Sequence, residues 1–236
     1  TANLARRYSD NNASLTPHLK LIKNTIFQFY NGFDIDMIKG HPTILVEIAK
    51  SNDIALDGVQ FYIDNFKQIA IELGEYYTPD SAYCDDQITP ADIKYLFNLT
   101  IYGGGFSTWV KSIQEGNAKK GIPPRNVAIQ PPHKYYTDFK NDIDEFKKKL
   151  IEKNPVLLKT VSKPEDPQWK NENRFMSYYC QIIENDCVYT AYNALLDKCP
   201  AFKRRVAWAY DGFTTFAPLP PEITMPEMID YINNAV

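Results

Sequence analysis

The sequence predicts an α+β fold with many helices and few strands. Two segments carry strand patterns: residues 33–38 alternate acidic and apolar side chains, and residues 206–216 form two apolar arms around an Asp-Gly pair. The other patterned segments repeat apolar residues at helical spacing. With 236 residues and 44% hydrophobic content, the chain suits one large globular unit or a tightly fused pair of lobes.

The helices are predicted from apolar periodicity and from start and stop signals. Thr89-Pro90-Ala91-Asp92 places an acid three residues after a hydroxyl cap and a proline between them, so a helix begins there and ends at Gly103-Gly104-Gly105. Residues 116–134, rich in Gly, Pro and Lys, are expected to form a loop, and residues 155–168 an irregular stretch. The predicted helices cover residues 16–29, 41–50, 57–73, 93–102, 136–153, 173–198 and 226–234.

Each of the two strand segments carries an acid where a strand ends. In residues 33–38, alternation of period two places Asp34 and Asp36 on one face and the apolar side chains on the other. In residues 206–216, Asp-Gly is the favoured pair for a two-residue hairpin turn, which places Asp211 at that turn. Taken alone, each acid is explained as an ordinary strand-end or turn residue.

The bulk composition limits the classes of partner and compartment. A formal net charge of −3 gives no overall attraction to nucleic-acid phosphates, although a local basic groove is compatible with it. Four cysteines without a C-x-x-C pair and three scattered histidines indicate reduced thiols and no structural zinc site. The sequence has no bilayer-spanning stretch and no signal peptide, so we expect an intracellular protein with no membrane partner. Because it lacks an initiator Met, we expect it to be part of a longer protein.

One predicted helix carries a stripe of polar side chains. Lys94, Asn98 and Tyr102 are spaced four apart, so they share one face that runs up to the triple glycine. A Lys ammonium suits a triphosphate, and a Tyr two turns later can stack near a base or sugar. The alternative is a solvated Lys, a helix-facing Asn and a core Tyr before an ordinary Gly stop.

Asp36 and Asp211 are far apart in sequence, but a fold that brings them together would create a site for two Mg²⁺ ions. Paired carboxylates can hold two such ions for an in-line displacement, in which a 3′-hydroxyl attacks and pyrophosphate leaves.

Three motifs occur in a fixed order along the chain. The first is a strand ending in Asp36 and followed by a helix, DIDMIKGHP over residues 34–42; the second is KYLFNLTIYG over residues 94–103; the last is YDGF over residues 210–213. A helix carrying Asn173, Gln181 and Glu184 lies between the second and the last. This order and spacing resemble the palm and fingers of family A DNA polymerases, in the divergent form found in replication proteins of large DNA viruses, mobile elements and plasmids.

The resemblance implies a fold and a set of partners. The palm, with a small antiparallel sheet, would comprise about residues 1–56 and 165–236, and helical fingers about residues 57–164, in a single catalytic region. The partners would be a DNA primer-template and nucleoside triphosphates, with helicase or primase regions as possible further parts of the same polypeptide.

The resemblance also implies residue roles. Asp36 and Asp211 would hold two Mg²⁺ ions, with Mn²⁺ as a possible substitute, and Lys94 would contact the triphosphate as a third catalytic residue. The remaining residues implied to bind are Asn98, Tyr102 and His41 for the nucleotide, and Gln181, Asn173, Arg7 and Arg204 for the nucleic acid.

Four positions depart from the family pattern. His41 stands where a Glu often blocks the ribose 2′-hydroxyl, and Pro90 stands where many relatives have a second basic residue. Gly212 replaces the acid that usually follows the last Asp, and Tyr210 replaces the usual His. The resemblance therefore leaves open which sugar is selected and how tightly the triphosphate is bound.

The basic residues have simpler explanations as well. Arg7, next to Arg6 and Tyr8, resembles a segment that touches template or primer, and a frayed terminus explains it equally well. Arg204, within Lys203-Arg204-Arg205, could approach a primer phosphate, although such a charge run is often a solvated strand end.

The sequence thus favours a template-directed nucleotidyltransferase of the DNA polymerase type. The alternatives are a primase-type variant that uses ribonucleotides, an inactive polymerase-like module that binds nucleic acid in a replication initiator, and a two-metal hydrolase.

Overall fold

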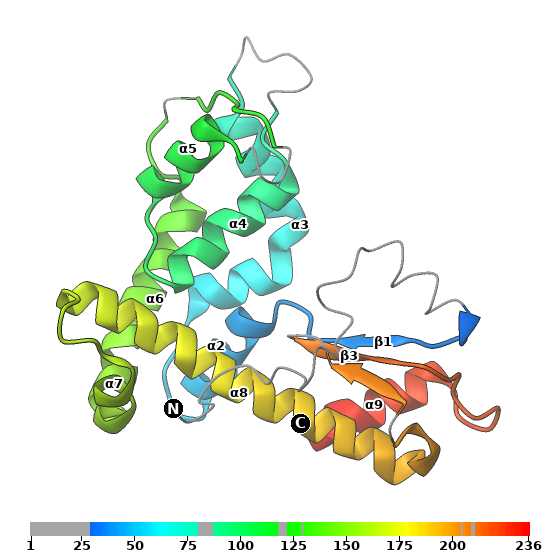
Figure 1. Cartoon of the computed structure of the whole chain (residues 1–236). Coiled ribbons are helices and arrows are strands. Elements are labelled where there is room, and N and C mark those ends of the chain that lie inside the picture. The colour runs from blue at the N-terminus through cyan, green and yellow to red at the C-terminus, as the bar shows by residue number, and fades with distance from the viewer. Residues whose placement is uncertain (1–28, 80–86, 118–121, 129, 204, 209–210) are drawn as a thin grey trace. The chain divides into compact units, whose positions relative to one another are not determined.

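The structure is a computed structural model that describes residues 29–79, 87–117, 122–128, 130–203, 205–208 and 211–236 (Figure 1). The helix predicted over residues 16–29 lies outside the described residues, except for residue 29. Arg7 and Arg204 also lie outside the described residues. Within the described residues the fold is α+β and mostly helical, with a three-stranded antiparallel sheet.

The chain divides into two compact units, one of which is made of two separate stretches of sequence. One unit comprises Thr1–His41 and Tyr178–Val236, and the other comprises Pro42–Ser177. The boundaries between the units lie inside helix α2 (Gly40–Lys50) and helix α8 (Gln168–Lys198).

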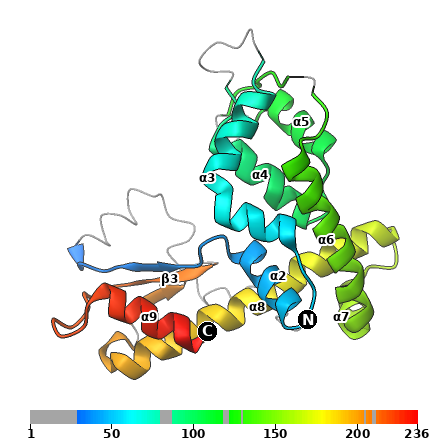
Figure 2. The same cartoon turned by 180° about the vertical axis from the view of Figure 1, so that it is seen from behind.

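The first unit contains the sheet. Strands β1 (Asp34–Asp36), β2 (Val206–Trp208) and β3 (Gly212–Thr215) are ordered β1-β3-β2, and both pairs are antiparallel. The second part of α8, the 3₁₀ helix η4 (Pro200–Phe202) and helix α9 (Met225–Ala235) complete the unit. Figures 1 and 2 show α8 and α9 on the same side of the sheet.

The two faces of the sheet differ in chemistry, as the alternation in the sequence predicts. Phe33 and Phe213 are buried against Leu195 of α8 and Ile232 of α9 in one hydrophobic core. The opposite face carries Asp34, Asp36 and Thr214, and Thr214 donates a hydrogen bond to Asp34. Asp34 therefore lies on the face turned away from the α8–α9 core, and Asp36 lies where that face meets the end of the sheet.

The second unit is built from helices around an aromatic core. It contains α3 (Asp57–Tyr77), α4 (Pro90–Ile101), α5 (Phe106–Glu115), α6 (Lys134–Lys153) and α7 (Pro155–Val161). The rings of Tyr62, Phe97 and Phe139 are mutually 4.4–5.2 Å apart between centroids and are buried. Each such pair contributes about 0.5–1.5 kcal/mol beyond the burial of its area, so this cluster fixes how α3, α4 and α6 pack.

Three features differ from the sequence-based expectation. Residues 155–161 form helix α7 rather than an irregular stretch, because Pro155 occupies the first turn, where its missing N–H costs nothing. Helix α5 was not foreseen; its apolar signal is the pair Trp109 and Ile113, four residues apart. The hairpin is also longer than a two-residue turn, because Trp208 pairs with Phe213.

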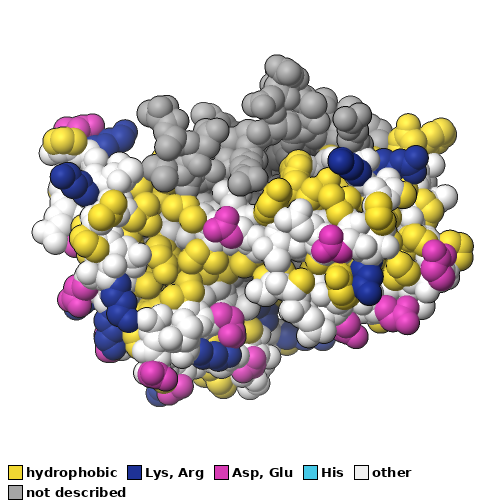
Figure 3. Space-filling view, turned by 90° about the horizontal axis from the view of Figure 1, so that it is seen from below, with side chains coloured by type: hydrophobic (Ala, Val, Ile, Leu, Met, Phe, Trp, Pro, Cys, Tyr) yellow, Lys and Arg dark blue, Asp and Glu magenta, His cyan; other side chains and the backbone are white. Residues whose placement is uncertain are grey.

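The surface charges are mixed. On the face shown in Figure 3, the described Lys and Arg side chains are interspersed with Asp and Glu side chains and with hydrophobic groups, rather than gathered into one basic patch. This distribution agrees with the net charge of −3.

Candidate active site

The pairing of β1 with β3 brings Asp36 next to Asp211. Asp36 is the partner of Gly212 in the antiparallel register, and Asp211 directly precedes Gly212. Beyond the strand, the backbone N–H of Met37 donates a hydrogen bond of 3.0 Å to the Asp211 carbonyl. Two acids 175 positions apart are thus held side by side by main-chain hydrogen bonds at one end of the sheet.

Gly212 makes this close approach possible. A Cβ atom at position 212 would lie 2.0 Å from the carbonyl oxygen of Ile35 and 2.9 Å from the Cα of Asp36. Real Cβ atoms do not approach backbone so closely, so a side chain here would push β1 away from β3. The absence of an acid after Asp211, noted as a departure from the family pattern, therefore has a steric reason in this chain.

The electrostatics of Asp36 reflect this arrangement. Partial burial raises the pKa of the Asp36 carboxyl, and the negative charge of Asp211 beside it raises the pKa further. A hydrogen bond of 3.0 Å from the Met37 N–H to Asp36 Oδ1 acts in the opposite direction but does not cancel these effects. Two neighbouring carboxylates resist ionising together, so a cation between them would relieve their repulsion.

The carboxylates of Asp36 and Asp211 suit a hard divalent cation that keeps water or substrate phosphate oxygens as its other ligands. Among the described residues, no group of three or more His, Cys, Asp or Glu side chains is arranged to hold a metal ion. Mg²⁺ is commonly bound through one or two carboxylates together with water and substrate phosphates. Asp36 and Asp211 fit that mode and not an all-protein cage.

A buried pair of side chains lies in the same unit. His41 Nε2 is 2.9 Å from Glu184 Oε1, and the two side chains are 12% and 3% exposed. Glu184 is on α8 between buried Cys180 and Val188, one turn away on either side. Burial, followed by the negative charge of Glu184, raises the pKa of the Cys180 thiol to about 12, so this thiol stays neutral.

Helix α4 presents the predicted polar stripe in the other unit. Lys94 is exposed, and Asn98 and Tyr102 are half-buried on the same face. The helix begins with the predicted capping box, in which the Thr89 hydroxyl accepts from the Asp92 N–H and the Asp92 carboxylate accepts from the Thr89 N–H. It ends at Ile101, with Tyr102 as its C-cap residue, and Gly103 follows with a φ of +79°.

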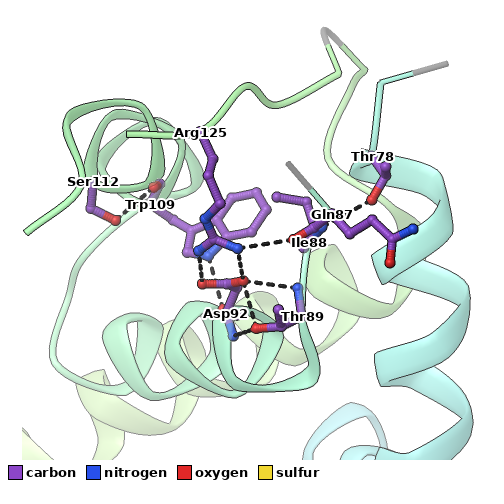
Figure 4. A network of polar contacts seen from close by, with 8 residues as sticks. All are labelled: Thr78, Gln87, Ile88, Thr89, Asp92, Trp109, Ser112 and Arg125. Atoms are coloured by element: carbon purple, nitrogen blue, oxygen red, sulfur yellow. Dashed lines mark hydrogen bonds and ion pairs between the residues drawn. The ribbon is translucent and has the colours of Figure 1, made fainter. Parts of the chain in front are cut away.

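A network of polar contacts fixes the start of α4 (Figure 4). The Arg125 guanidinium donates to both carboxylate oxygens of Asp92 at 2.9 and 2.6 Å and also to the Gln87 carbonyl. The Trp109 Nε1–H donates to the backbone carbonyl of Asp92 at 2.9 Å. Burial opposes ionisation of Asp92, but hydrogen bonds from Arg125 and Thr89 outweigh it, so the pKa of Asp92 is lowered. The loop expected over residues 116–134 thereby anchors α4 through Arg125.

The end of α4 meets the start of α8. A Cβ atom at Gly103 would lie 2.0 Å from Oδ1 of Asn173, so the Asn173 amide packs directly on the glycine backbone. Asn173, which the resemblance assigned to nucleic-acid binding, is thus adjacent to the Tyr102-Gly103 end of the stripe.

The predicted site residues fall into two groups. Asp36, Asp211, His41 and Gln181 belong to the unit with the sheet, and Lys94, Asn98, Tyr102 and Asn173 belong to the helical unit. Three contributions were not predicted: the Glu184–His41 pair, the Arg125–Asp92 pair and the steric role of Gly212. The signal for Glu184 was an acid at a core position of a helix, flanked at four-residue spacing by Cys180 and Val188.

Comparison with known proteins adds no relative. No protein-family model, no curated protein sequence and no solved structure matches the chain. Of the helices in the described part of the chain, none is both long and apolar enough to cross a membrane.

Proposed function

We propose that the chain is the catalytic part of a template-directed nucleotidyltransferase of the DNA polymerase type. The observation that supports this most is the β1–β3 pairing, which holds Asp36 beside Asp211 at one end of the sheet. The proposal assigns this sheet to a palm and the helical unit to fingers. Both assignments come from the motif order, and the small antiparallel sheet is compatible with them.

In this proposal Asp36 and Asp211 hold two Mg²⁺ ions, or Mn²⁺ in their place. The bound metal would activate a primer 3′-hydroxyl and stabilise the leaving pyrophosphate. The chain's own contribution is positioning: the Met37 N–H donates to both Asp36 Oδ1 and the Asp211 main-chain carbonyl, so the Asp36 carboxylate is held beside the Asp211 backbone.

The helical unit would supply nucleotide contacts. The exposed Lys94 ammonium suits a triphosphate, and Asn98 and Tyr102 continue that face toward Gly103. His41 would lie near the sugar. The primer-template would contact Gln181, Asn173, Arg7 and Arg204.

A primer-extension assay tests the proposal. The chain is incubated with Mg²⁺ or Mn²⁺, a template with and without an annealed primer, and either dNTPs or rNTPs. We expect dNTP incorporation on the primed template. Extension without a primer, using rNTPs, would instead support the primase-type variant.

Matched variants at the sheet sharpen this assay. Asp36→Asn and Asp211→Asn are each expected to lower the rate about 100-fold or more, because metal charge stabilisation is worth several kcal/mol. Asp34→Asn is the control, since Asp34 shares the strand and the face of Asp36 but bonds to Thr214. Equal rates for Asp211→Asn and the parent chain would refute the proposal.

The second candidate is an inactive polymerase-like module that binds nucleic acid. It is favoured by the two-acid donor set, which Gly212 cannot extend. It predicts salt-sensitive DNA binding without incorporation under any divalent metal. DNA cleavage without synthesis would point instead to the two-metal hydrolase.

A further inference from the structure

A small pocket opens at the end of the sheet that carries the two acids. Its volume is about 120 Å³, and it lies among β1, β3, α8 and α9 within one unit. Asp36 and Asp211 form part of its lining. The apolar side chains around it are Ile35, Met37, Val188, Ala191, Phe213, Ile232 and Val236.

The pocket as a whole, at about 120 Å³, has the size of a small organic group. An apolar cavity of about 150 Å³ in another protein stays dry and holds a benzene molecule. Ala191 of α8 and Phe213 of β3 both line the pocket, and both residues belong to the hydrophobic core. A ring or a short alkyl chain would therefore replace poorly hydrated space with van der Waals contacts.

The charged side chains in the lining of the pocket, Asp36 and Asp211, are both acidic. Among the ion pairs between described side chains, none involves Asp36 or Asp211. The other polar groups in the lining are the Asn233 amide and the Cys187 thiol. Burial, followed by the charge of Asp186, raises the pKa of Cys187, so the thiol adds no charge. A cationic group complements this end of the pocket.

We propose that this pocket binds a small organic amine, with its apolar body against Ala191 and Phe213 and its ammonium group at the end of the sheet, beside Asp36 and Asp211. The binding follows from the pocket alone. Competition between such an amine and a divalent metal rests on the proposed function, in which the same carboxylates hold the metal.

Calorimetric titration with three matched probes tests the binding. Benzylammonium carries both the ring and the charge, benzyl alcohol carries the ring alone, and methylammonium carries the charge alone. We expect benzylammonium to bind at least tenfold more tightly than either of the others, because only it fills both parts of the pocket. Equal affinity for benzylammonium and benzyl alcohol, or no binding of benzylammonium, overturns the proposal.

Variants locate the bound amine. Asp211→Asn is expected to weaken benzylammonium about tenfold and to leave benzyl alcohol unchanged, whereas Asp34→Asn changes neither. Asn233→Lys, at an exposed lining position, places a tethered cation beside the pair and is expected to weaken benzylammonium without disturbing the core. Unchanged binding in both Asp211→Asn and Asn233→Lys would overturn the assignment of the site.

A competition experiment separates this proposal from the proposed function. If Mn²⁺ raises the apparent dissociation constant of benzylammonium, the amine and the metal share the carboxylates. If benzylammonium binds with the expected variant pattern and Mn²⁺ has no effect, the amine site stands and the metal role fails. If Mn²⁺ binds at the pair and benzylammonium does not bind, the amine site fails and the metal role stands.

Discussion

Glu184 on α8 lies 2.9 Å from Nε2 of His41, and the two side chains are largely removed from solvent. Removing one member of a buried polar pair takes a contact away from the other member, at a cost of about 1–3 kcal/mol. Glu184→Ala is therefore expected to lower the free energy of unfolding by that amount in urea denaturation. His41→Ala is expected to lower it similarly.

The double variant His41→Leu/Glu184→Leu distinguishes pairing from packing. Replacing both partners by apolar groups of similar size is often neutral, so we expect the double variant to be more stable than either single alanine variant. A double variant as unstable as the sum of the single losses would show that the two side chains act independently.

Gly212→Ala is expected to separate the two candidate metal ligands. The new methyl group would lie 2.0 Å from the Ile35 carbonyl oxygen, and β1 would have to move away from β3. We expect a loss of about 1–3 kcal/mol in stability, as for other overpacked sites, together with loss of Mn²⁺ binding measured by calorimetry. Gly105→Ala is the control, because a Cβ there meets no atom within 4 Å.

Local patterns predicted most of the elements but not their pairing. The capping box at Thr89 and Asp92 and the alternation that puts Asp36 opposite the apolar face depend on neighbours in sequence, and both are found in the structure. The register of Asp36 with Gly212 depends on two segments 176 residues apart. Any one-residue slip would also reverse the faces, so the core residues fix the register, and no local motif encodes it.

The side-chain pairs could not be predicted from the sequence for the same reason. Arg125 lay in a stretch expected to form a loop, and nothing near it in sequence indicates Asp92 as its partner. The error at the hairpin has a different origin. Asp-Gly favours a two-residue turn, but Gly212 is required as a strand residue for the approach of β1, so the connection from Trp208 is longer.

Asp36→Asn is expected to stabilise the protein at neutral pH. The pKa of Asp36 is raised in the folded state, so the folded protein holds this proton more tightly than the unfolded chain. The corresponding stability is present below the unfolded pKa of 3.8 and is lost as pH rises through the folded pKa. At pH 7 the ionised acid therefore costs stability that Asn does not.

Thermal unfolding at several pH values measures this effect. The melting temperature of Asp36→Asn should exceed that of the parent chain at pH 7, and the difference should shrink as pH falls toward 3. Added Mn²⁺ should raise the melting temperature of the parent and not of the variant. A parent chain more stable than Asp36→Asn at pH 7 without metal would contradict the prediction.

Arg125→Lys is expected to destabilise the start of α4, although it keeps the charge. The guanidinium bonds both oxygens of Asp92 and the Gln87 carbonyl, and the side chains of Arg125 and Asp92 are 10% and 13% exposed. A lysine cannot reproduce this forked geometry, so we expect a loss of about 1–3 kcal/mol in urea denaturation. Lys111→Ala, which removes an exposed pair with Glu115 at 3.6 Å, should change stability by less than about 1 kcal/mol. Equal losses in the two variants would mean that burial and bidentate geometry do not distinguish the Arg125–Asp92 pair from a surface contact.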